Sequence, residues 1–143
     1  MNARLSTHDL SGALRIAMAR LSRRLSAEKD DDDLSDSQTA TLGYLVREGS
    51  GTIGRLSEFE RVKPPSMNRT VNRLEEAGYV ERTADAADGR KVVVVPTERG
   101  AGLVAETRRR RDAWLHQRLR TLSAEERATL AEAARIMREL ADS

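Results

Sequence analysis

Apolar residues recur at helical spacing near the start of the chain: Leu10, Leu14, Met18, Leu21 and Leu25. Intervals of four and three positions place them on one face, so we predict an amphipathic helix. The helix should end at the charged run 28–33, which is typical of a solvated loop because neighbouring like charges repel. A metal site in the aspartates of this run is less favoured, since the spaced ligands and turn glycine of a calcium loop are missing.

Start and stop signals predict two short helices in the next segment. Ser35 followed by Gln38 is a capping-box pattern and opens a helix that stops before Gly49. Thr52 can cap a third helix, which ends before the prolines. The apolar residues that these two helices present are Leu42, Leu45, Val46, Ile53, Leu56 and Phe59.

A fourth helix is predicted from about Pro64 to Ala77, with Gly78 as its stop signal. Prolines are tolerated in a first helical turn, because the N–H groups there have no partner in the helix. The apolar positions of this helix, Met67, Val71 and Leu74, follow helical spacing and should face the core.

A β-hairpin should follow the fourth helix. Tyr79–Arg82 alternates, and Lys91–Val95 is strongly β-forming, while the residues between them form a polar turn with Asp88-Gly89 near the tip. Pro96 ends the second strand, and Thr97 can cap a long helix that continues to Leu119. Ser123 with Glu126 forms another capping box and opens a last helix that reaches Leu140.

The predicted fold class is mainly α with a small β-hairpin wing: a winged helix-turn-helix plus terminal dimerisation helices. The 143 residues fit one domain, with the winged helix-turn-helix at 34–100 and helical dimerisation parts at 5–28 and 101–141. Terminal helices with more apolar surface than a compact winged helix can cover favour a homodimer. The alternative is that they pack only on one another in a monomer.

Composition excludes several functions. The chain has no cysteine, which rules out disulfides, thiolate catalysis and zinc-thiolate sites. His8 and His116 stand alone, and no nucleophile motif or glycine-rich phosphate loop is present, so we expect neither an enzyme nor a cofactor or metal. Without a membrane-spanning run or the apolar core of a signal peptide, we expect a cytoplasmic protein and no membrane partner.

Charge gathers in the middle of the chain. Residues 61–111 contain 12 lysines and arginines against 7 acids, a net +5, while the remaining residues carry −3. Such a basic segment suits the phosphate backbone of DNA, although a solvated face is the commoner cause of a charge excess. The run Arg108–Arg111 points to all sides of a helix, which favours a solvated face over a phosphate clamp.

The fourth helix and the hairpin together carry the DNA-binding hypothesis. The positions of the helix that face away from its apolar stripe are Ser66, Asn68, Arg69, Asn72 and Arg73. Arginine can bind guanine and asparagine adenine in the major groove, while serine and the helix N-terminus suit phosphate oxygens. At the hairpin tip, Arg90 beside Lys91 could enter the minor groove, and Asp88 is placed to orient an arginine. The alternatives are an ordinary solvated helix face and a charged hairpin edge.

The chain resembles the MarR family of bacterial winged helix-turn-helix regulators over nearly its whole length. The segments that carry the resemblance are the junction 73–82, the Asp88-Gly89-Arg90 wing and the Thr97–Gly100 run. The resemblance implies that Arg90 is the wing residue and that Ser66, Asn68, Arg69 and Arg73 lie in the recognition helix. The chain departs from the family at Lys63-Pro64-Pro65, so the first-turn contacts, with Lys63 and Pro65 as candidates, are expected to differ.

The resemblance also implies a small aromatic or anionic effector, with Tyr44, Phe59 and Trp114 as candidate lining residues; alternatively these aromatic side chains are simply core. The predicted function is a sequence-specific regulator of transcription, a repressor that binds a two-fold symmetric double-stranded DNA operator. The alternative is an architectural protein that coats DNA without sequence preference. The asparagines and arginines of the fourth helix argue against that alternative, because they suit base edges rather than phosphates alone.

Overall fold

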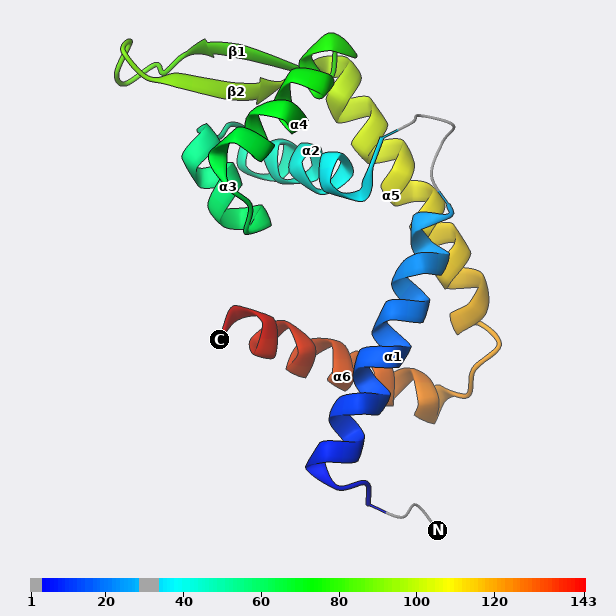
Figure 1. Cartoon of the computed structure of the whole chain (residues 1–143). Coiled ribbons are helices and arrows are strands. Elements are labelled where there is room, and N and C mark those ends of the chain that lie inside the picture. Colours follow the sequence, from blue (N-terminus) through cyan, green and yellow to red (C-terminus); the bar gives the residue numbers. More distant parts are fainter. Residues whose placement is uncertain (1–3, 29–33) are drawn as a thin grey trace. The chain divides into compact units, whose positions relative to one another are not determined.

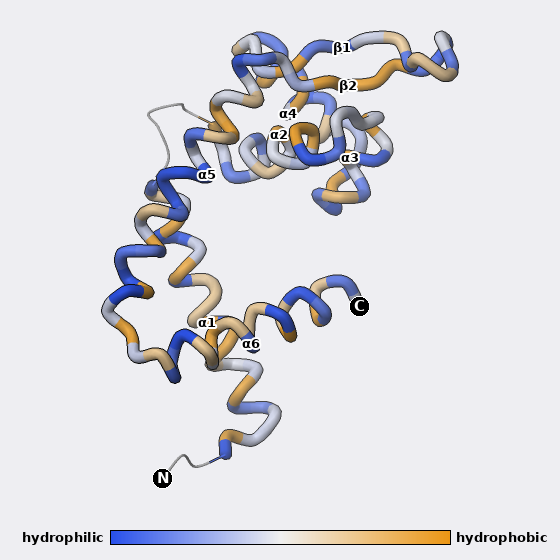
Figure 2. Tube along the Cα trace, turned by 180° about the vertical axis from the view of Figure 1, so that it is seen from behind, coloured by the Kyte–Doolittle hydropathy of each residue, from blue (hydrophilic) through white to orange (hydrophobic). Residues whose placement is uncertain are grey.

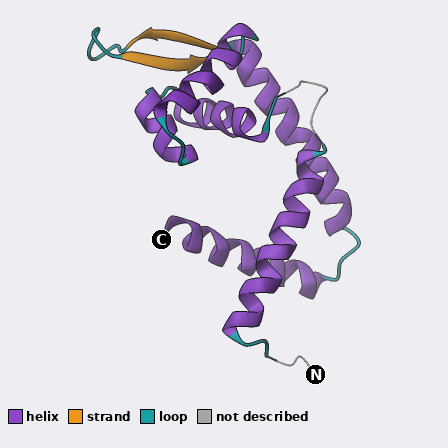
Figure 3. Cartoon of the chain, in the orientation of Figure 1, coloured by secondary structure: helices purple, strands orange, loops and turns teal. Residues whose placement is uncertain are grey.

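The computed structural model describes residues 4–28 and 34–143, so most of the acidic run, at 29–33, lies outside the described residues. Six helices and two strands follow one another in the described part (Figure 3): α1 (Thr7–Ser26), α2 (Asp36–Glu48), α3 (Ile53–Glu60), α4 (Pro64–Glu76), β1 (Val80–Ala84), β2 (Val92–Pro96), α5 (Glu98–Leu119) and α6 (Ala124–Asp142). The predicted fold class, mainly helical with one hairpin, is confirmed. None of the described helices is long and apolar enough to cross a membrane.

The chain divides into two compact units. Unit 2 is residues 29–109, and unit 1 is residues 1–28 together with 110–143. Helix α5 therefore contributes its first half to unit 2 and its second half to unit 1.

Helix caps form where the sequence predicts them. Ser35 and Ser123 each close a capping box with the residue three positions on, and Thr52 accepts a hydrogen bond from the Arg55 backbone N–H at 3.2 Å. Thr97 Oγ1 accepts from the Gly100 N–H at 3.1 Å at the start of α5. These bonds satisfy N–H groups that have no partner within the helix.

The core of unit 2 lies between α2, α3, α4, the hairpin and the start of α5. Leu45, Leu56 and Met67 are among its fully buried residues. A cross-strand bridge joins Gly51 to Val94, which ties the loop after α2 to β2. The backbone of Gly100 passes close to the backbone of Tyr79. A Cβ at this position would lie 2.1 Å from the Tyr79 carbonyl oxygen, so only glycine fits here.

The hairpin is antiparallel and projects from the helices of unit 2 (Figure 1). Val80 pairs with Pro96 and Ala84 with Val92, so both strands begin one residue later than predicted and Lys91 lies in the connecting loop. Figure 2 shows β2 as a hydrophobic strand beside a more polar β1. Only Val94 of β2 is fully buried, because side chains alternate between the two faces of a strand.

Unit 1 has no comparable core. None of its described residues is buried, and α1 and α6 contain no buried residue. Large apolar side chains lie on the surface instead, among them Met18, Leu21, Leu130 and Ile136. The two helices are nevertheless well formed, since capping and helix propensity act locally.

Candidate DNA interface

Helix α4 has one buried face and one exposed face. Met67, Val71 and Leu74 have no exposed surface, as their spacing predicts. The outer positions Asn68, Arg69, Asn72 and Arg73 are exposed, and Ser66 is half-buried. The buried residues pack α4 against the core of unit 2, and this packing fixes the position of the outer face.

The first turn of α4 offers no free backbone donor. Pro64 and Pro65 have no N–H, and the N–H groups of Ser66 and Met67 both donate to the Lys63 carbonyl oxygen, at 3.0 and 3.2 Å. A phosphate oxygen at this helix N-terminus would therefore have to be bound by side chains rather than by backbone N–H groups. The candidates at this end of α4 are the exposed Lys63 and the hydroxyl of Ser66.

Two of the outer residues make contacts along α4 itself. The Asn68 side-chain amide donates to the Pro64 carbonyl oxygen at 3.2 Å, and an Arg69 guanidinium nitrogen donates to Ser66 Oγ at 3.1 Å. Both contacts are exposed and local, so DNA can replace them at little cost.

Asn72 is held from outside the helix. Its Oδ1 accepts a hydrogen bond from Arg82 Nη2 at 2.9 Å, and Arg82 Nη1 donates to Glu75 Oε1 at 2.8 Å. The sequence prediction did not include Arg82 as a site residue. The alternation of side chains along a strand could have identified it. Arg82 lies two positions after the buried Val80, so both side chains are on the same face of β1.

The hairpin loop presents the predicted wing arginine. The Arg90 side chain is 93% exposed, and its Nε donates to Asp88 Oδ1 at 3.3 Å, so Asp88 contacts the arginine as predicted. Asp88 Oδ1 also accepts from the Arg90 backbone N–H at 3.1 Å, which fixes the turn. Lys91 is exposed beside it, and its N–H donates to the Asp88 carbonyl oxygen.

The four consecutive arginines of α5 have different surroundings. Arg109 forms a salt bridge with Glu106 at 2.7 Å, and the hydrogen bond to this carboxylate raises the pKa of Arg109. Arg111 Nε donates to the Leu25 carbonyl oxygen at the C-terminal end of α1, where the helix dipole favours a cation. These contacts favour the interpretation that the run does not act as one phosphate clamp.

The aromatic side chains considered for an effector fall into two groups. In unit 2, the Tyr44 and Phe59 rings lie 4.6 Å apart, with the Arg47 guanidinium 5.5 and 5.7 Å from their centroids. Phe59 is 43% exposed and lies against Tyr44, so the alternative that its side chain is simply core does not hold. Trp114 belongs to unit 1, where Arg118 stacks on it at 3.9 Å.

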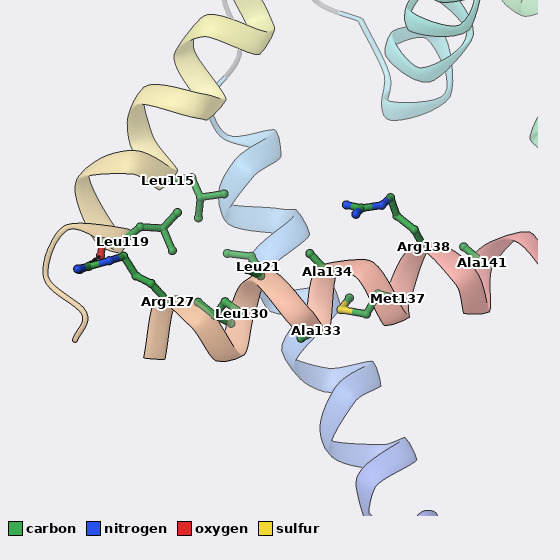
Figure 4. Close-up of a pocket in the computed structure, with 11 residues that line it drawn as sticks. Leu21, Leu115, Leu119, Arg127, Leu130, Ala133, Ala134, Met137, Arg138 and Ala141 are labelled. Carbon is green, nitrogen blue, oxygen red and sulfur yellow. Dashed lines mark hydrogen bonds between the residues drawn. The ribbon is translucent and has the colours of Figure 1, made fainter. Parts of the chain in front are cut away.

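Unit 1 contains an apolar groove of about 690 Å³ (Figure 4). Its lining comes from α1, the second half of α5 and α6: Leu21, Leu115, Leu119, Arg127, Leu130, Ala131, Ala133, Ala134, Met137, Arg138 and Ala141. Only two of these residues are charged. Among residues 4–28 and 34–143, no group of three or more His, Cys, Asp and Glu side chains could hold a metal ion.

Comparison with known proteins agrees with this geometry. Residues 32–91 match the sequence model of the MarR family. An HTH-type transcriptional regulator of Mycobacterium tuberculosis is 43% identical over 133 residues, which cover 93% of each chain. The chain therefore belongs to the MarR family of DNA-binding transcriptional regulators.

Solved structures share the fold over all or nearly all of the chain. A MarR family protein from Bacillus stearothermophilus superimposes with a TM-score of 0.86 at 25% identity, covering 100% of this chain and 99% of the other. FabT of Streptococcus pneumoniae, solved in complex with DNA, gives a TM-score of 0.77 at 19% identity, covering 94% of this chain and 98% of FabT. At that identity the likeness to FabT concerns the fold.

Proposed function

We propose that this protein is a cytoplasmic repressor that binds a two-fold symmetric operator as a homodimer, with α4 in the major groove and the hairpin in the minor groove. The observation that carries the proposal is the exposed face of α4. Asparagine and arginine side chains lie on this face, and the opposite face of the same helix is fully buried in the core. These residue types form hydrogen bonds with base edges in the major groove. The solved complex of FabT with DNA supports DNA binding by a protein of this fold.

The groove and exposed leucines of unit 1 support the homodimer. Side chains such as Leu130, which is 47% exposed, would lose this exposure against a second copy of the chain. Burial of apolar surface stabilises the assembly by about 25 cal/mol per Å². Two copies related by a two-fold axis would present two reading heads, and the operator would then have matching half-sites.

The test is selection of bound duplexes from a random pool by the full chain. We expect a two-fold symmetric site, and competition with random duplex should give a specificity ratio of about 10³ or more. A ratio near one would contradict the proposal and support a protein that coats DNA without sequence preference.

The role of α4 can be tested within the selected site. Arg69→Ala should cost about 1–3 kcal/mol of binding free energy at one base pair in each half-site, because a bidentate contact is lost. Binding to operator variants with single base changes measures this. An equal loss on every duplex would assign Arg69 to the phosphate backbone.

We also propose that a small aromatic or anionic effector weakens DNA binding. The Tyr44, Phe59 and Arg47 cluster offers two rings and a cation, and Trp114 provides a fluorescent probe in the other unit. An effector must weaken operator binding by the same factor by which the operator weakens effector binding. Titration with salicylate-like acids up to millimolar concentration should change Trp114 fluorescence and operator affinity over one range. No response in either would contradict this part of the proposal.

A further inference from the structure

Arg82 makes three hydrogen bonds to α4 from the neighbouring strand. Its Nη2 donates to Asn72 Oδ1 at 2.9 Å and its Nη1 to Glu75 Oε1 at 2.8 Å, while its backbone N–H donates to Glu75 Oε2 at 3.3 Å. The Arg82 side chain is 26% exposed, so it is more enclosed than the other partners of this network. Glu75 thus holds both the backbone and the side chain of Arg82 in place.

The chemistry of arginine decides which way the Asn72 amide turns. A guanidinium has only donors, so the Asn72 atom that faces Arg82 must be the carbonyl oxygen Oδ1 and cannot be the amide nitrogen. The amide nitrogen Nδ2 is then directed away from Arg82 on an exposed residue, and it donates to no other described residue. An asparagine without such a hydrogen bond can rotate its amide group, so that Oδ1 and Nδ2 exchange positions.

We propose that Arg82 is a positioning residue that sets the base preference of Asn72. With Oδ1 held, Asn72 presents N–H donors to DNA and favours a base edge made of acceptors. Guanine offers two acceptors in the major groove, N7 and O6, whereas cytosine offers only the N4 donor. The usual pairing of asparagine with adenine needs Oδ1 as an acceptor for the adenine N6–H, and here the hydrogen bond from Arg82 holds Oδ1 toward β1, which leaves the donor Nδ2 as the outward atom.

This inference rests on the proposed function, because it concerns how the α4 face reads DNA. It departs from the sequence-based expectation for Asn72, which was adenine. We expect one base pair in each half-site at which the wild-type chain prefers guanine over cytosine by roughly tenfold, the value of one good contact.

The experiment is selection from a randomised duplex pool with the full-length wild type and three variants. Arg82→Ala frees the Asn72 amide, so the guanine preference at that base pair should fall at least about threefold while adenine gains. Asn72→Asp keeps an oxygen for Arg82 but replaces the outward donor by an acceptor. The preference at the same base pair should then turn from guanine to cytosine, whose N4 donates to a carboxylate.

Asn68→Asp is the matched control, because it makes the same change on the same helix at a residue that Arg82 does not hold. Because Asn68 is itself a candidate reading residue, its variant should change the preference at another base pair and leave the preference at the Asn72 base pair unchanged. Thermal unfolding of each variant checks the fold, and Asn72→Asp tests the inference even if Arg82→Ala does not fold, since it keeps the Arg82 contacts.

The results separate the inference from the proposed function. If the wild type selects no sequence, the proposed function is overturned and the inference with it. If the wild type selects a site but Arg82→Ala keeps every base preference, or if Arg82→Ala and Asn72→Asp act at different base pairs, the positioning role alone is overturned. A wild type that prefers adenine at the Asn72 base pair would also overturn it.

Discussion

Unit 2 holds leucine, methionine and valine side chains with no exposed surface, whereas no described residue of unit 1 is buried. Both units nevertheless contain helices that begin with a capping box. Local sequence signals therefore define where helices begin, but they do not provide a core. The difference indicates that unit 2 is stabilised by its own packing, whereas the apolar surface of unit 1 is exposed in the single chain and would be covered in the proposed dimer.

The largest difference between the units should appear when a leucine is truncated. Leu56→Ala removes a fully buried side chain from unit 2 and should lower the free energy of unfolding by about 2–5 kcal/mol. Leu130→Ala, the matched change in unit 1, should cost much less at chain concentrations too low for association. Urea unfolding measures both, and equal losses in dilute solution would contradict the comparison.

A charge placed in the groove of unit 1 should act on assembly and leave unit 2 folded. Leu130→Asp should convert the proposed dimer to a monomer and weaken operator binding by roughly a hundredfold, since the second half-site no longer binds as part of one molecule. Sedimentation and operator titration measure these effects. Thr129→Asp is the control, because Thr129 does not line the groove. A Leu130→Asp chain that remains dimeric would assign the interface elsewhere.

A change in the hairpin loop of unit 2 should act on DNA binding and leave assembly unchanged. Arg90→Glu should weaken binding to all duplexes and lower the slope of log affinity against log salt by about 1, because the wing loses a cation that attracts the negative minor groove and releases counterions on binding. Its oligomeric state should not change. Arg120→Glu makes the same charge change in unit 1 as a control. An unaltered salt slope for Arg90→Glu would show that the wing does not touch DNA.

The smallest expected effect concerns the turn between α3 and α4. Arg61 has φ of 55°, a left-handed conformation that costs a residue with a Cβ about 1 kcal/mol relative to glycine. Arg61→Gly should therefore raise the free energy of unfolding of unit 2 by up to about 1 kcal/mol, measured in urea. Arg55→Gly, within the regular helix α3, should lower it by a similar amount. A loss of stability in Arg61→Gly would show that the arginine side chain contributes more than the strain costs.

The sequence by itself determined the elements and the orientation of α4. Caps such as Ser35 and Thr52, the prolines at the start of α4 and the valines of β2 act on their own neighbours, so their effect can be predicted without the rest of the chain. The spacing of Met67, Val71 and Leu74 likewise defines the buried face of α4 and, with it, the exposed asparagines and arginines.

Only the tertiary structure decided what these exposed residues contact. Arg82 reaches Asn72 across ten positions of sequence, because β1 returns along α4 after Gly78 turns the chain with φ of 81°. The exposure of Phe59 depends on where the short helix α3 sits against α2, and Leu56 alone of its apolar residues is fully buried. Periodicity describes one helix or strand at a time, whereas these contacts depend on the packing of one element on another. The direction of an exposed amide is therefore decided by a neighbouring strand.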